Sequence, residues 1–514
     1  MERINRLILT LIISAFISAP VYSASVWIND ARSVFGSKNA IMYEVNLRTF
    51  NSKDKNGNGI IEENLGDERG TFSSAIERLD ELEASGVNML VVMPITSVGK
   101  IKAIGTAGSL YAPVSFTEIN PQLKSKNSNL SSVDEARKFV DECHKRKIRV
   151  IVDLPACASY ELFLKRPELF KKDKNQNPII PSDWTDVRLL DSGTNSEINQ
   201  DVYDLYKNFV LTMMDIGFDG VRAAVPSTKT FSFWKKLVSD IRAREPQFLF
   251  LADQSSLSKS VSEYSPNTSL DKILDAGFDG YYGGFSDIES WKSANGLHST
   301  VNKNLQIMFK TQGKAVPISD FATHDSLSPI ISGGKEYSKM LIWLNATLPL
   351  NPMFTDGFST GDSYLYPLIN RKASKSYTDD EYYFVHRGQM DIFNLSRAQI
   401  GPHLDLYREY VMACRFRNAV RDLVASGSYE PLRTTSPAVF AYLRSYNDTS
   451  LVVYGNLNFK TGVSVRVFVP KLKGNIESTP VKIKSIPKLN KNKIDVTLAP
   501  GEIQVFLFTT DNSK

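Results

Sequence analysis

Short apolar runs alternate with amphipathic stretches along most of the chain. The β-branched and aromatic runs predict strands, and several are followed by apolar residues at helical spacing, as at Ala75, Leu79 and Leu82. The predicted strands are Ile41–Val45, Met89–Met93, Val150–Leu154, Gly220–Ala223 and Phe248–Ala252, with weaker ones at Gly280–Tyr282, Val316–Phe321 and Met353–Thr355. The predicted helices are Thr71–Ser85, Val133–Lys147, Asp201–Met214 and Phe231–Arg242. This alternation is typical of parallel βαβ units.

About eight such units fit a closed barrel better than an open sheet. We therefore predict an α/β fold in which residues 35–425 form a (β/α)8 TIM barrel, with an insertion at about 155–194 after the third strand. Beyond residue 428 the apolar runs become short and are separated by Gly, Asn and Pro, which predicts an all-β sandwich domain over residues 429–514. Its predicted strands are Ala438–Tyr446, Leu451–Leu457, Val463–Val469, Val481–Ile486 and Ile503–Phe508.

The composition limits the class of protein. Of 514 residues, 42% are apolar and 23% are charged, which excludes a disordered chain, a coiled coil and a small disulfide-stapled scaffold. The net charge of +5 gives no reason to expect a nucleic-acid partner, and the Lys-rich stretch Lys471–Lys493 is interpreted as a solvated face. The chain has three cysteines, Cys143, Cys157 and Cys414, so at most one disulfide can form.

The first residues have the pattern of a secretory signal peptide. Arg3 and Arg6 precede the apolar run Leu7–Ile17, and small residues follow up to Ser23. A membrane span needs about 20 apolar residues, so the run is short for one. We therefore predict that residues 1–23 are removed and that the protein is secreted or periplasmic, without a membrane span. An uncleaved anchor is the alternative.

Polar residues stand at the ends of several predicted strands. Asp153 ends the third strand, Arg222 the fourth and Asp253 the fifth, while His324 and Asp325 follow the seventh. In a barrel of this type the reactive groups lie at the carboxyl ends of the strands. We expect these five side chains to meet in one polar cleft.

With these strand ends the chain resembles the α-amylase superfamily, glycoside hydrolase family 13. Four further motifs carry the likeness, which covers about residues 40–421: Tyr43–Asn46, Gly108–Tyr111, Asp183–Val187 and Ala346–Pro349. The resemblance implies a protein of carbohydrate metabolism that acts on α-linked glucose polymers. It also implies that Asp153, Arg222, His324 and Asp325 occupy the family's site positions, and that Tyr111 stacks on the sugar next to the cleaved bond.

The positions that carry the family's chemistry are altered. Ala224 stands where retaining members have a carboxylate nucleophile, and Asp253 stands where they have a Glu as the general acid. Cys157, Ala158 and Thr323 likewise replace polar residues of the family. Retaining hydrolysis needs two carboxyl groups about 5–5.5 Å apart, and a methyl group forms no covalent intermediate. The side chain of Asp253 is one methylene shorter than Glu, which lowers the expected rate of hydrolysis further, because about 1 Å of misplacement can cost ~10²-fold in rate.

These departures favour recognition of an α-glucan or maltooligosaccharide with impaired or absent hydrolysis. Tyr111, Trp184, Arg222 and His324 are the candidate substrate-binding residues, because aromatic faces and a few polar groups hold a sugar ring without chemistry. Tyr281 and Tyr282 are further candidate platforms, with ordinary packing as the alternative. Cys157 is expected to be a buried small residue and not a nucleophile.

Two other functions remain open. In the first, the protein is an active hydrolase or transglycosylase in which Asp253 is the acid and Asp325 is the base or an electrostatic stabiliser, with water in the room that Ala224 leaves. In the second, the barrel is a non-catalytic scaffold that binds a partner.

A loop after the first predicted strand alternates oxygen-bearing residues with glycines, as a cation loop does. It resembles the first five ligand positions of an EF-hand, although Leu65 stands at the position of the bidentate Glu. Many members of the superfamily carry a calcium loop here. By that resemblance the ligands of a structural Ca²⁺ would be Asp54, Asn56, Asn58, the Ile60 carbonyl and Glu62. A plain Asn-Gly turn is the alternative.

Overall fold

The computed structural model describes residues 27–55, 61–103, 108–181, 184–254, 264–291, 293–326, 328–363, 403–470, 475–481, 489–490 and 492–509. Three sets of predictions lie outside these residues: the signal peptide at 1–23, the calcium ligands Asn56, Asn58 and Ile60, and the strand Val481–Ile486 beyond its first residue. Among the helices that are described, none combines the length and the apolar character needed to cross a membrane.

Eight parallel strands form the barrel, in the order β10-β1-β2-β3-β6-β7-β8-β9. They are β1 (Met42–Val45), β2 (Met89–Val92), β3 (Arg149–Leu154), β6 (Gly220–Ala224), β7 (Leu249–Asp253), β8 (Gly280–Tyr282), β9 (Val316–Ile318) and β10 (Met353–Thr355). A parallel bridge between Ile318 and Asn351 brings the two end strands together. The predicted (β/α)8 barrel is confirmed.

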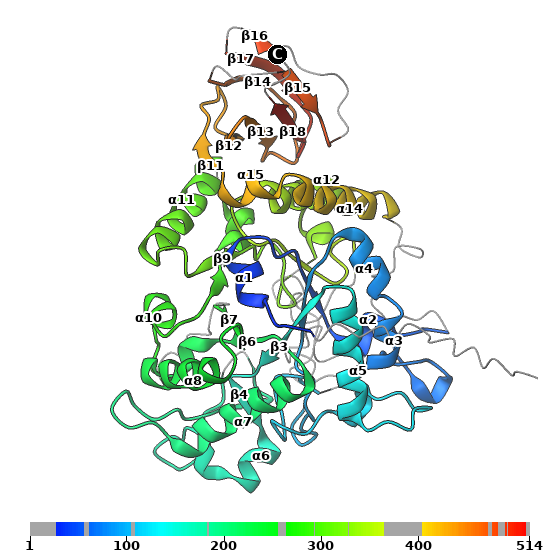
Figure 1. The fold of residues 1–514 in the computed structure, drawn as a ribbon, viewed down its shortest axis with the longest axis vertical. Coiled ribbons are helices and arrows are strands. Elements are labelled where there is room, and N and C mark those ends of the chain that lie inside the picture. Colours follow the sequence, from blue (N-terminus) through cyan, green and yellow to red (C-terminus); the bar gives the residue numbers. More distant parts are fainter. Residues whose placement is uncertain are drawn as a thin grey trace, which may run out of the picture.

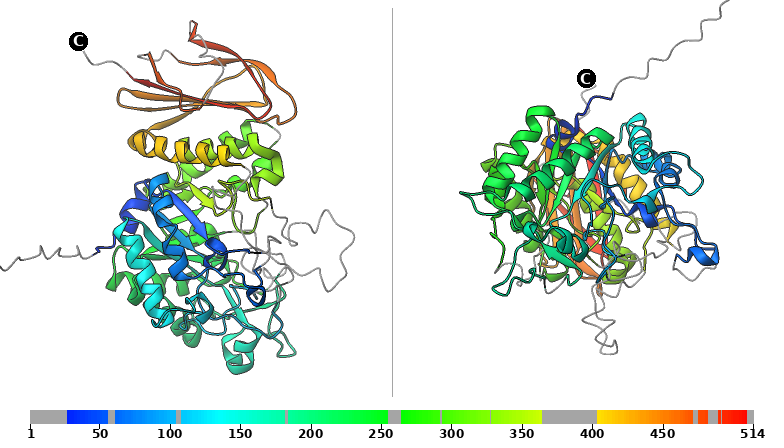
Figure 2. Two further views of the ribbon diagram at one scale, coloured as in Figure 1. Left: turned by 90° about the vertical axis from the view of Figure 1, so that its right-hand side faces the viewer. Right: turned by 90° about the horizontal axis from the view of Figure 1, so that it is seen from below.

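Helices lie outside these strands (Figures 1 and 2). They are α1 (Ala31–Gly36), α2 (Leu47–Phe50), α3 (Phe72–Ile76), α4 (Leu79–Ser85), α5 (Ser132–Lys145), α7 (Gln200–Ile216), α8 (Phe231–Arg244), α10 (Leu270–Asp275), α11 (Asn295–Lys310), α12 (Pro329–Thr347), α14 (Leu404–Ala419) and α15 (Arg421–Ser426). The side chains of Ser131, Asn199 and Thr230 accept backbone N–H groups at the starts of α5, α7 and α8. The predicted single helix Thr71–Ser85 is wrong in one respect, because it is divided between α3 and α4.

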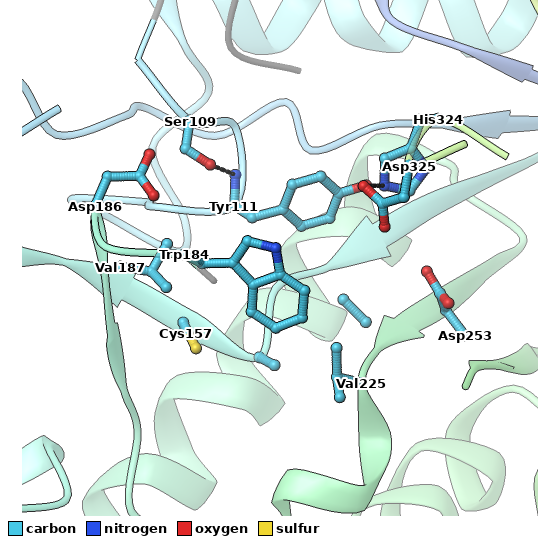
Figure 3. A pocket seen from close by; sticks show the side chains of 12 residues that line it. Ser109, Tyr111, Cys157, Trp184, Asp186, Val187, Val225, Asp253, His324 and Asp325 are labelled. Atoms are coloured by element: carbon cyan, nitrogen blue, oxygen red, sulfur yellow. Dashed lines mark hydrogen bonds and ion pairs between the residues drawn. The ribbon is translucent and has the colours of Figure 1, made fainter. Parts of the chain in front are cut away.

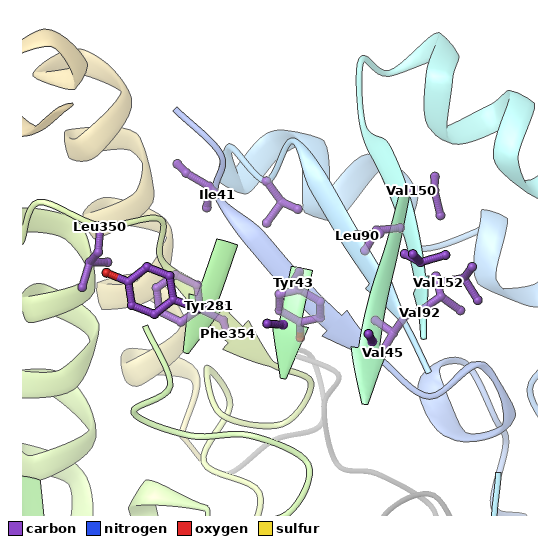
Figure 4. Packing of buried hydrophobic residues seen from close by; sticks show 14 of the residues in the cluster. Ile41, Tyr43, Val45, Leu90, Val92, Val150, Val152, Tyr281, Leu350 and Phe354 are labelled. Carbon is purple, nitrogen blue, oxygen red and sulfur yellow. The ribbon is translucent and has the colours of Figure 1, made fainter. Parts of the chain in front are cut away.

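Two apolar layers hold the barrel together. Alternate strand residues such as Tyr43, Leu90 and Val150 pack with the surrounding helices (Figure 4). The residues between them, such as Met42 and Met89, form a second cluster with further strand residues and with α1. A strand that is buried on both faces reads as a continuous apolar run, which explains why the sequence pattern located the strands.

The predicted insertion after the third strand is also present. It holds β4 (Cys157–Ser159), α6 (Tyr160–Lys165) and β5 (Val187–Leu189), and β4 pairs with β5 in an antiparallel two-stranded sheet. The insertion leaves the barrel at the end of β3 and returns at α7. It therefore forms part of the rim on the side where the barrel strands end.

The C-terminal region is a sandwich of two antiparallel sheets, as predicted, and lies beyond α12, α14 and α15 (Figure 1). One sheet has the order β11-β12-β13-β18-β15 and the other β14-β17-β16. The strands are β11 (Ser428–Pro431), β12 (Val439–Tyr446), β13 (Thr449–Asn456), β14 (Val463–Phe468), β15 (Asn475–Ser478), β16 (Leu489–Asn490), β17 (Lys493–Leu498) and β18 (Ile503–Thr509). The two sheets share one apolar core, in which Val439, Ala441 and Leu443 of β12 pack with Val465 and Val467 of β14.

Four of the five predicted strands of this domain have counterparts in β12, β13, β14 and β18. The interpretation of Lys471–Lys493 as a single solvated face is incomplete, because β15, β16 and the first residue of β17 fall within it. In β17, Ile494 and Leu498 are buried while Lys493 and Asp495 are exposed. Lys493 therefore begins a strand whose other face contributes to the core.

Candidate functional site

A pocket with about 510 Å³ of empty space, part of it open solvent, lies where the barrel strands end (Figure 3). Seven residues that were singled out from the sequence line it together: Tyr111, Cys157, Trp184, Ala224, Asp253, His324 and Asp325. The other lining residues are Ser109, Ala156, Asp186, Val187 and Val225.

Arg222 and Asp153 do not line this pocket and lie buried beside it. The Arg222 guanidinium donates to both carboxylate oxygens of Asp153, from Nε at 2.6 Å and from a terminal nitrogen at 2.5 Å. Its other terminal nitrogen lies 2.6 Å from Oε1 of Glu44 and donates to the Tyr282 hydroxyl at 2.7 Å. Burial opposes the charge of Arg222, but Asp153, Tyr282 and Glu44 outweigh it and raise the pKa of the guanidinium.

Glu44 links Arg222 to His324. Nδ1 of His324 lies 2.8 Å from Oε1 of Glu44, and Nε2 lies 3.4 Å from Oδ1 of Asp325. Burial lowers the pKa of His324, but Asp325 and Glu44 outweigh it and raise that pKa to about 9, so the imidazole is a cation at neutral pH. Burial opposes the charge of Glu44 as well, and Arg222 and His324 together lower its pKa. We call Glu44, Asp153, Arg222 and His324 the charged network; it has two cations and two carboxylates.

Tyr111 covers the charged network on the pocket side. Its hydroxyl donates to Asp153 at 2.6 Å, and its ring stacks on the His324 imidazole with centroids 5.4 Å apart and an interplanar angle of 10°. Trp184 lies across the pocket below Tyr111 (Figure 3). Tyr111 and Trp184 therefore border the same space, and Tyr111 is held in place by its contacts with the charged network.

The ends of β6 and β7 form a second edge of the pocket. Ala224 and Asp253 are partners in the parallel register of these strands, which are about 4.8 Å apart in a sheet. The next residue, Val225, has left-handed backbone angles (φ 41°, ψ 60°), which are rare for a β-branched residue, and its N–H donates to the Asp253 carbonyl at 3.1 Å. We call Ala224, Val225 and Asp253 the β6–β7 edge.

Three carboxylates are among the described residues that line the pocket: Asp186, Asp253 and Asp325. Asp186 lies on the far side of Trp184 from Asp253, whereas Asp325 and Asp253 lie on the same side (Figure 3). The side chain beside Asp253 in the sheet is the methyl group of Ala224. The pocket thus has acids that can donate or accept a proton, and a methyl group at the position that resemblance assigns to the nucleophile.

The remaining wall is apolar. Ala156, Cys157, Val187 and Val225 belong to one buried cluster on which Trp184 packs. Burial raises the pKa of the Cys157 thiol to about 11, which is contrary to what a nucleophilic thiolate needs. All three cysteines are free and buried. The expectation of a small buried residue at Cys157 agrees with this environment.

Two proposed sugar platforms are wrong. Tyr281 is 1% exposed and packs in the barrel core, and Tyr282 is 8% exposed with its hydroxyl oxygen accepting from Arg222. Conversely, Glu44 and Asp186 stand within two of the motifs that carry the resemblance, but no role in the site was predicted for either. The signal for Glu44 was available, because it is the charged residue in the otherwise apolar, fully buried strand β1.

The loop of the predicted calcium site is described at its two ends only. Asp67 is buried, and its carboxylate accepts the N–H of Lys55 at 2.8 Å and that of Glu62 at 2.9 Å. Lys53 and Glu68 form an antiparallel bridge just outside these residues. The loop that begins at Asp54 is therefore closed at its base by protein groups.

Comparisons with known proteins extend this description. No family model matches the chain. Among curated proteins, an α-1,4-glucan:maltose-1-phosphate maltosyltransferase of Picrophilus torridus is 22% identical over 421 residues, which is 78% of this chain and 61% of the relative. Isoamylase 1 of rice (Oryza sativa subsp. japonica) is 28% identical over 142 residues, 26% of this chain and 16% of the relative. The matches span less than two thirds of the length of these relatives.

Solved structures resemble the whole described fold. An α-amylase from Lactobacillus plantarum matches with a TM-score of 0.65 and 17% identity, covering 92% of this chain and all of that one. A debranching enzyme from Nostoc punctiforme, soaked with acarbose, matches with a TM-score of 0.66 and 15% identity, covering 91% of this chain and 98% of that one. The chain therefore has the fold of the α-amylase superfamily, glycoside hydrolase family 13, and resembles its members in sequence.

Proposed function

We propose that this protein is an exported α-glucan-binding protein with the α-amylase fold, whose pocket holds a maltooligosaccharide without retaining hydrolysis. The observation that carries the proposal is the methyl group of Ala224 beside Asp253 in the sheet. A covalent glycosyl intermediate needs a nucleophilic oxygen or another nucleophilic atom, and a methyl group supplies none.

The positions of Tyr111 and Trp184 at the pocket support the proposed binding of a sugar. Aromatic faces stack on the C–H face of a sugar ring, and polar groups at the edges then fix its orientation. His324 and Asp325 offer such groups at the pocket wall, and the hydrogen bond from Tyr111 to Asp153 fixes one aromatic face before a ligand arrives. A preformed site loses less entropy on binding than one that must be ordered.

An inverting hydrolase is the second candidate, and one observation favours it. Asp253 and Asp325 both line the pocket on the same side of Trp184. In an inverting reaction Asp253 would protonate the leaving oxygen, and Asp325 would remove a proton from the attacking water. Such a reaction needs no residue at position 224 but requires two carboxyl groups about 6.5–9.5 Å apart.

The test compares binding and turnover on protein lacking residues 1–23. Calorimetry with maltoheptaose measures the dissociation constant, and release of reducing sugar from starch measures hydrolysis. We expect binding without release, and at least about tenfold weaker binding for Tyr111→Ala. Tyr446→Ala is a matched control, because Tyr446 is an exposed tyrosine of the C-terminal sheet.

The other outcomes identify the alternatives. Sugar release that disappears in Asp253→Asn would contradict the non-hydrolytic proposal, and an inverted anomer in the product would establish the second candidate. Absence of binding to soluble and insoluble glucans would favour a scaffold or partner-binding barrel. Recovery of a protein that retains residues 1–23 in the membrane fraction would contradict cleavage and indicate an anchor.

A structural Ca²⁺ in the loop from Asp54 to Glu62 is also proposed. The supporting observation is that Asp67 accepts the N–H groups of both Lys55 and Glu62, which holds the two ends of the loop close to one carboxylate. Bound calcium would pin the loop, and a ligand of the native state raises stability by mass action. We expect chelator to lower the melting temperature of the wild type and to leave that of Asp54→Ala unchanged. Equal melting curves of the wild type with and without chelator would refute the site.

A further inference from the structure

We propose that Lys229 is a positioning residue of the pocket, which holds the β3 and β6 walls in register for the ligand. The inference rests on the proposed sugar-binding function and assigns a role to a residue that does not itself line the pocket. Lys229 donates a hydrogen bond to Ala156 on one wall and is connected through Thr228 to Val225 on the other.

Lys229 is completely buried just after the short turn that follows β6. Its ammonium group donates to the Ala156 carbonyl at 2.9 Å and to the Thr228 hydroxyl oxygen at 3.1 Å. Ala156 lies in the segment after β3 and lines the pocket. One end of this connection is therefore part of the pocket wall.

The second connection runs through Thr228. The Thr228 hydroxyl donates to the Val225 carbonyl at 2.8 Å, and the Val225 N–H donates to the Asp253 carbonyl at 3.1 Å. Val225 has a left-handed backbone that its β-branched side chain disfavours, so neighbouring groups must hold it there. A continuous set of hydrogen bonds thus extends from Lys229 to the backbone of Asp253.

The environment of Lys229 is poor for a cation. Both of its hydrogen-bond acceptors are neutral oxygens, and the Tyr206 ring, with its centroid 5.5 Å from the ammonium nitrogen, compensates the charge only through a cation–π contact. Burial lowers the pKa of Lys229 to about 8, and Cys157 and Asp191 oppose this only in part. A buried charge of this kind reduces stability, so an apolar side chain of similar length would suit the fold better.

The unfavourable burial of the Lys229 charge allows a positioning role to be distinguished from a purely structural one. A residue that merely supports the fold lowers the melting temperature when it is replaced. For Lys229→Met we expect a melting temperature no lower than that of the wild type, together with about tenfold weaker binding of maltoheptaose. Lys236→Met is the control, because Lys236 is a half-exposed lysine on α8 paired with Asp240, and should leave binding unchanged.

A second pair of variants keeps the test valid if Lys229→Met does not fold. Thr228→Val removes the hydroxyl that links Lys229 to Val225, and Thr228→Ser keeps it. We expect weaker binding for Thr228→Val and wild-type binding for Thr228→Ser. Equal binding by the two variants would overturn the role of this hydrogen bond.

A readout without sugar separates this inference from the proposed function. Cys157 lines the pocket wall and is 6% exposed, whereas Cys143 and Cys414 are 0% and 2% exposed. Labelling of Cys157 with a thiol reagent should be faster in Thr228→Val than in Thr228→Ser, with Cys157→Ala identifying the signal. If the wild type binds no glucan, the proposed function fails. If the wild type binds and both Lys229→Met and Thr228→Val match it in affinity and labelling rate, the positioning role fails.

Discussion

The two sides of the pocket differ in how completely their polar groups are organised. In the charged network, Arg222 and His324 share Glu44 and are further paired with Asp153 and Asp325. At the β6–β7 edge, the side chain next to Asp253 is a methyl group. Under the proposed function, Tyr111, His324 and Asp325 on the first side hold and orient the sugar, whereas the second side lacks the atom that would attack it. The proposed function therefore requires that binding and bond cleavage are separable in this barrel, which the following variants test.

The largest expected effect comes from restoring the altered edge. In Ala224→Asp combined with Asp253→Glu, two carboxyl groups return to adjacent strand ends. We expect this double variant to release reducing sugar at least ~10²-fold faster than either single variant, because retaining hydrolysis needs both groups at the right separation. Reducing-sugar release from maltoheptaose is the measurement. Equal rates for single and double variants would show that position 224 does not limit the chemistry.

The charged network should respond to disruption by losing stability. Arg222→Met leaves Asp153 and Glu44 buried without their shared cation, and we expect the free energy of unfolding to fall by about 4 kcal/mol. Denaturant unfolding measures this change. Arg466→Met is a matched control, because Arg466 pairs with Asp495 on the exposed face of the C-terminal domain, and its replacement should change the free energy of unfolding far less than Arg222→Met does.

His324 of the charged network and Lys229, which is connected through Thr228 to the β6–β7 edge, should respond to pH with opposite signs. The folded-state pKa of His324 is raised to about 9, so its stabilising contribution is present below pH ~6.5 and is lost as pH rises through 9. The folded-state pKa of Lys229 is lowered to about 8, so its destabilising contribution decreases between pH ~8 and ~10.5. Each contribution amounts to about 3 kcal/mol.

Unfolding measured from pH 6 to 10.5 checks these signs through differences from the wild type. The stability of the wild type relative to His324→Gln should fall with pH, and its stability relative to Lys229→Met should rise. Two differences of the same sign would contradict the assigned charge states.

The smallest expected effect concerns the contact between the charged network and the aromatic wall. Tyr111→Phe removes the hydrogen bond to Asp153 and keeps the ring that stacks on His324. We expect a loss of about 1.5 kcal/mol in unfolding free energy, as is usual for a hydrogen bond to a charged group. A much larger loss would show that the ring itself changes its position.

Much of the fold could be predicted from sequence because buried parallel strands are continuous apolar runs and helices repeat at a different period. The pattern was less informative for β17, where Lys493 and Asp495 on the outer face obscured the buried Ile494 and Leu498. It also gave no indication of the break between α3 and α4. Both errors concern short elements, whose boundaries depend on contacts with the rest of the chain.

The candidate site was partly predictable for a related reason. Asp253, His324 and Asp325 were found because polar residues at strand ends share one edge of a barrel. Tyr281 and Tyr282 were placed wrongly, because a strand end by itself does not say which side chains face the pocket. The role of Glu44 was missed although a charge in a buried strand was a signal, since its partners Arg222 and His324 lie far from it in the sequence.

The sequence by itself determined the alternation of strands and helices and the methyl group at position 224, because both are properties of residue order and residue type. Only the tertiary structure decided that Glu44 lies between Arg222 and His324 and that Lys229 is bonded to Ala156. These pairs are separated by between 73 and 280 positions in the chain. Closure of the barrel brings such distant residues within hydrogen-bond distance, and no local pattern records that proximity.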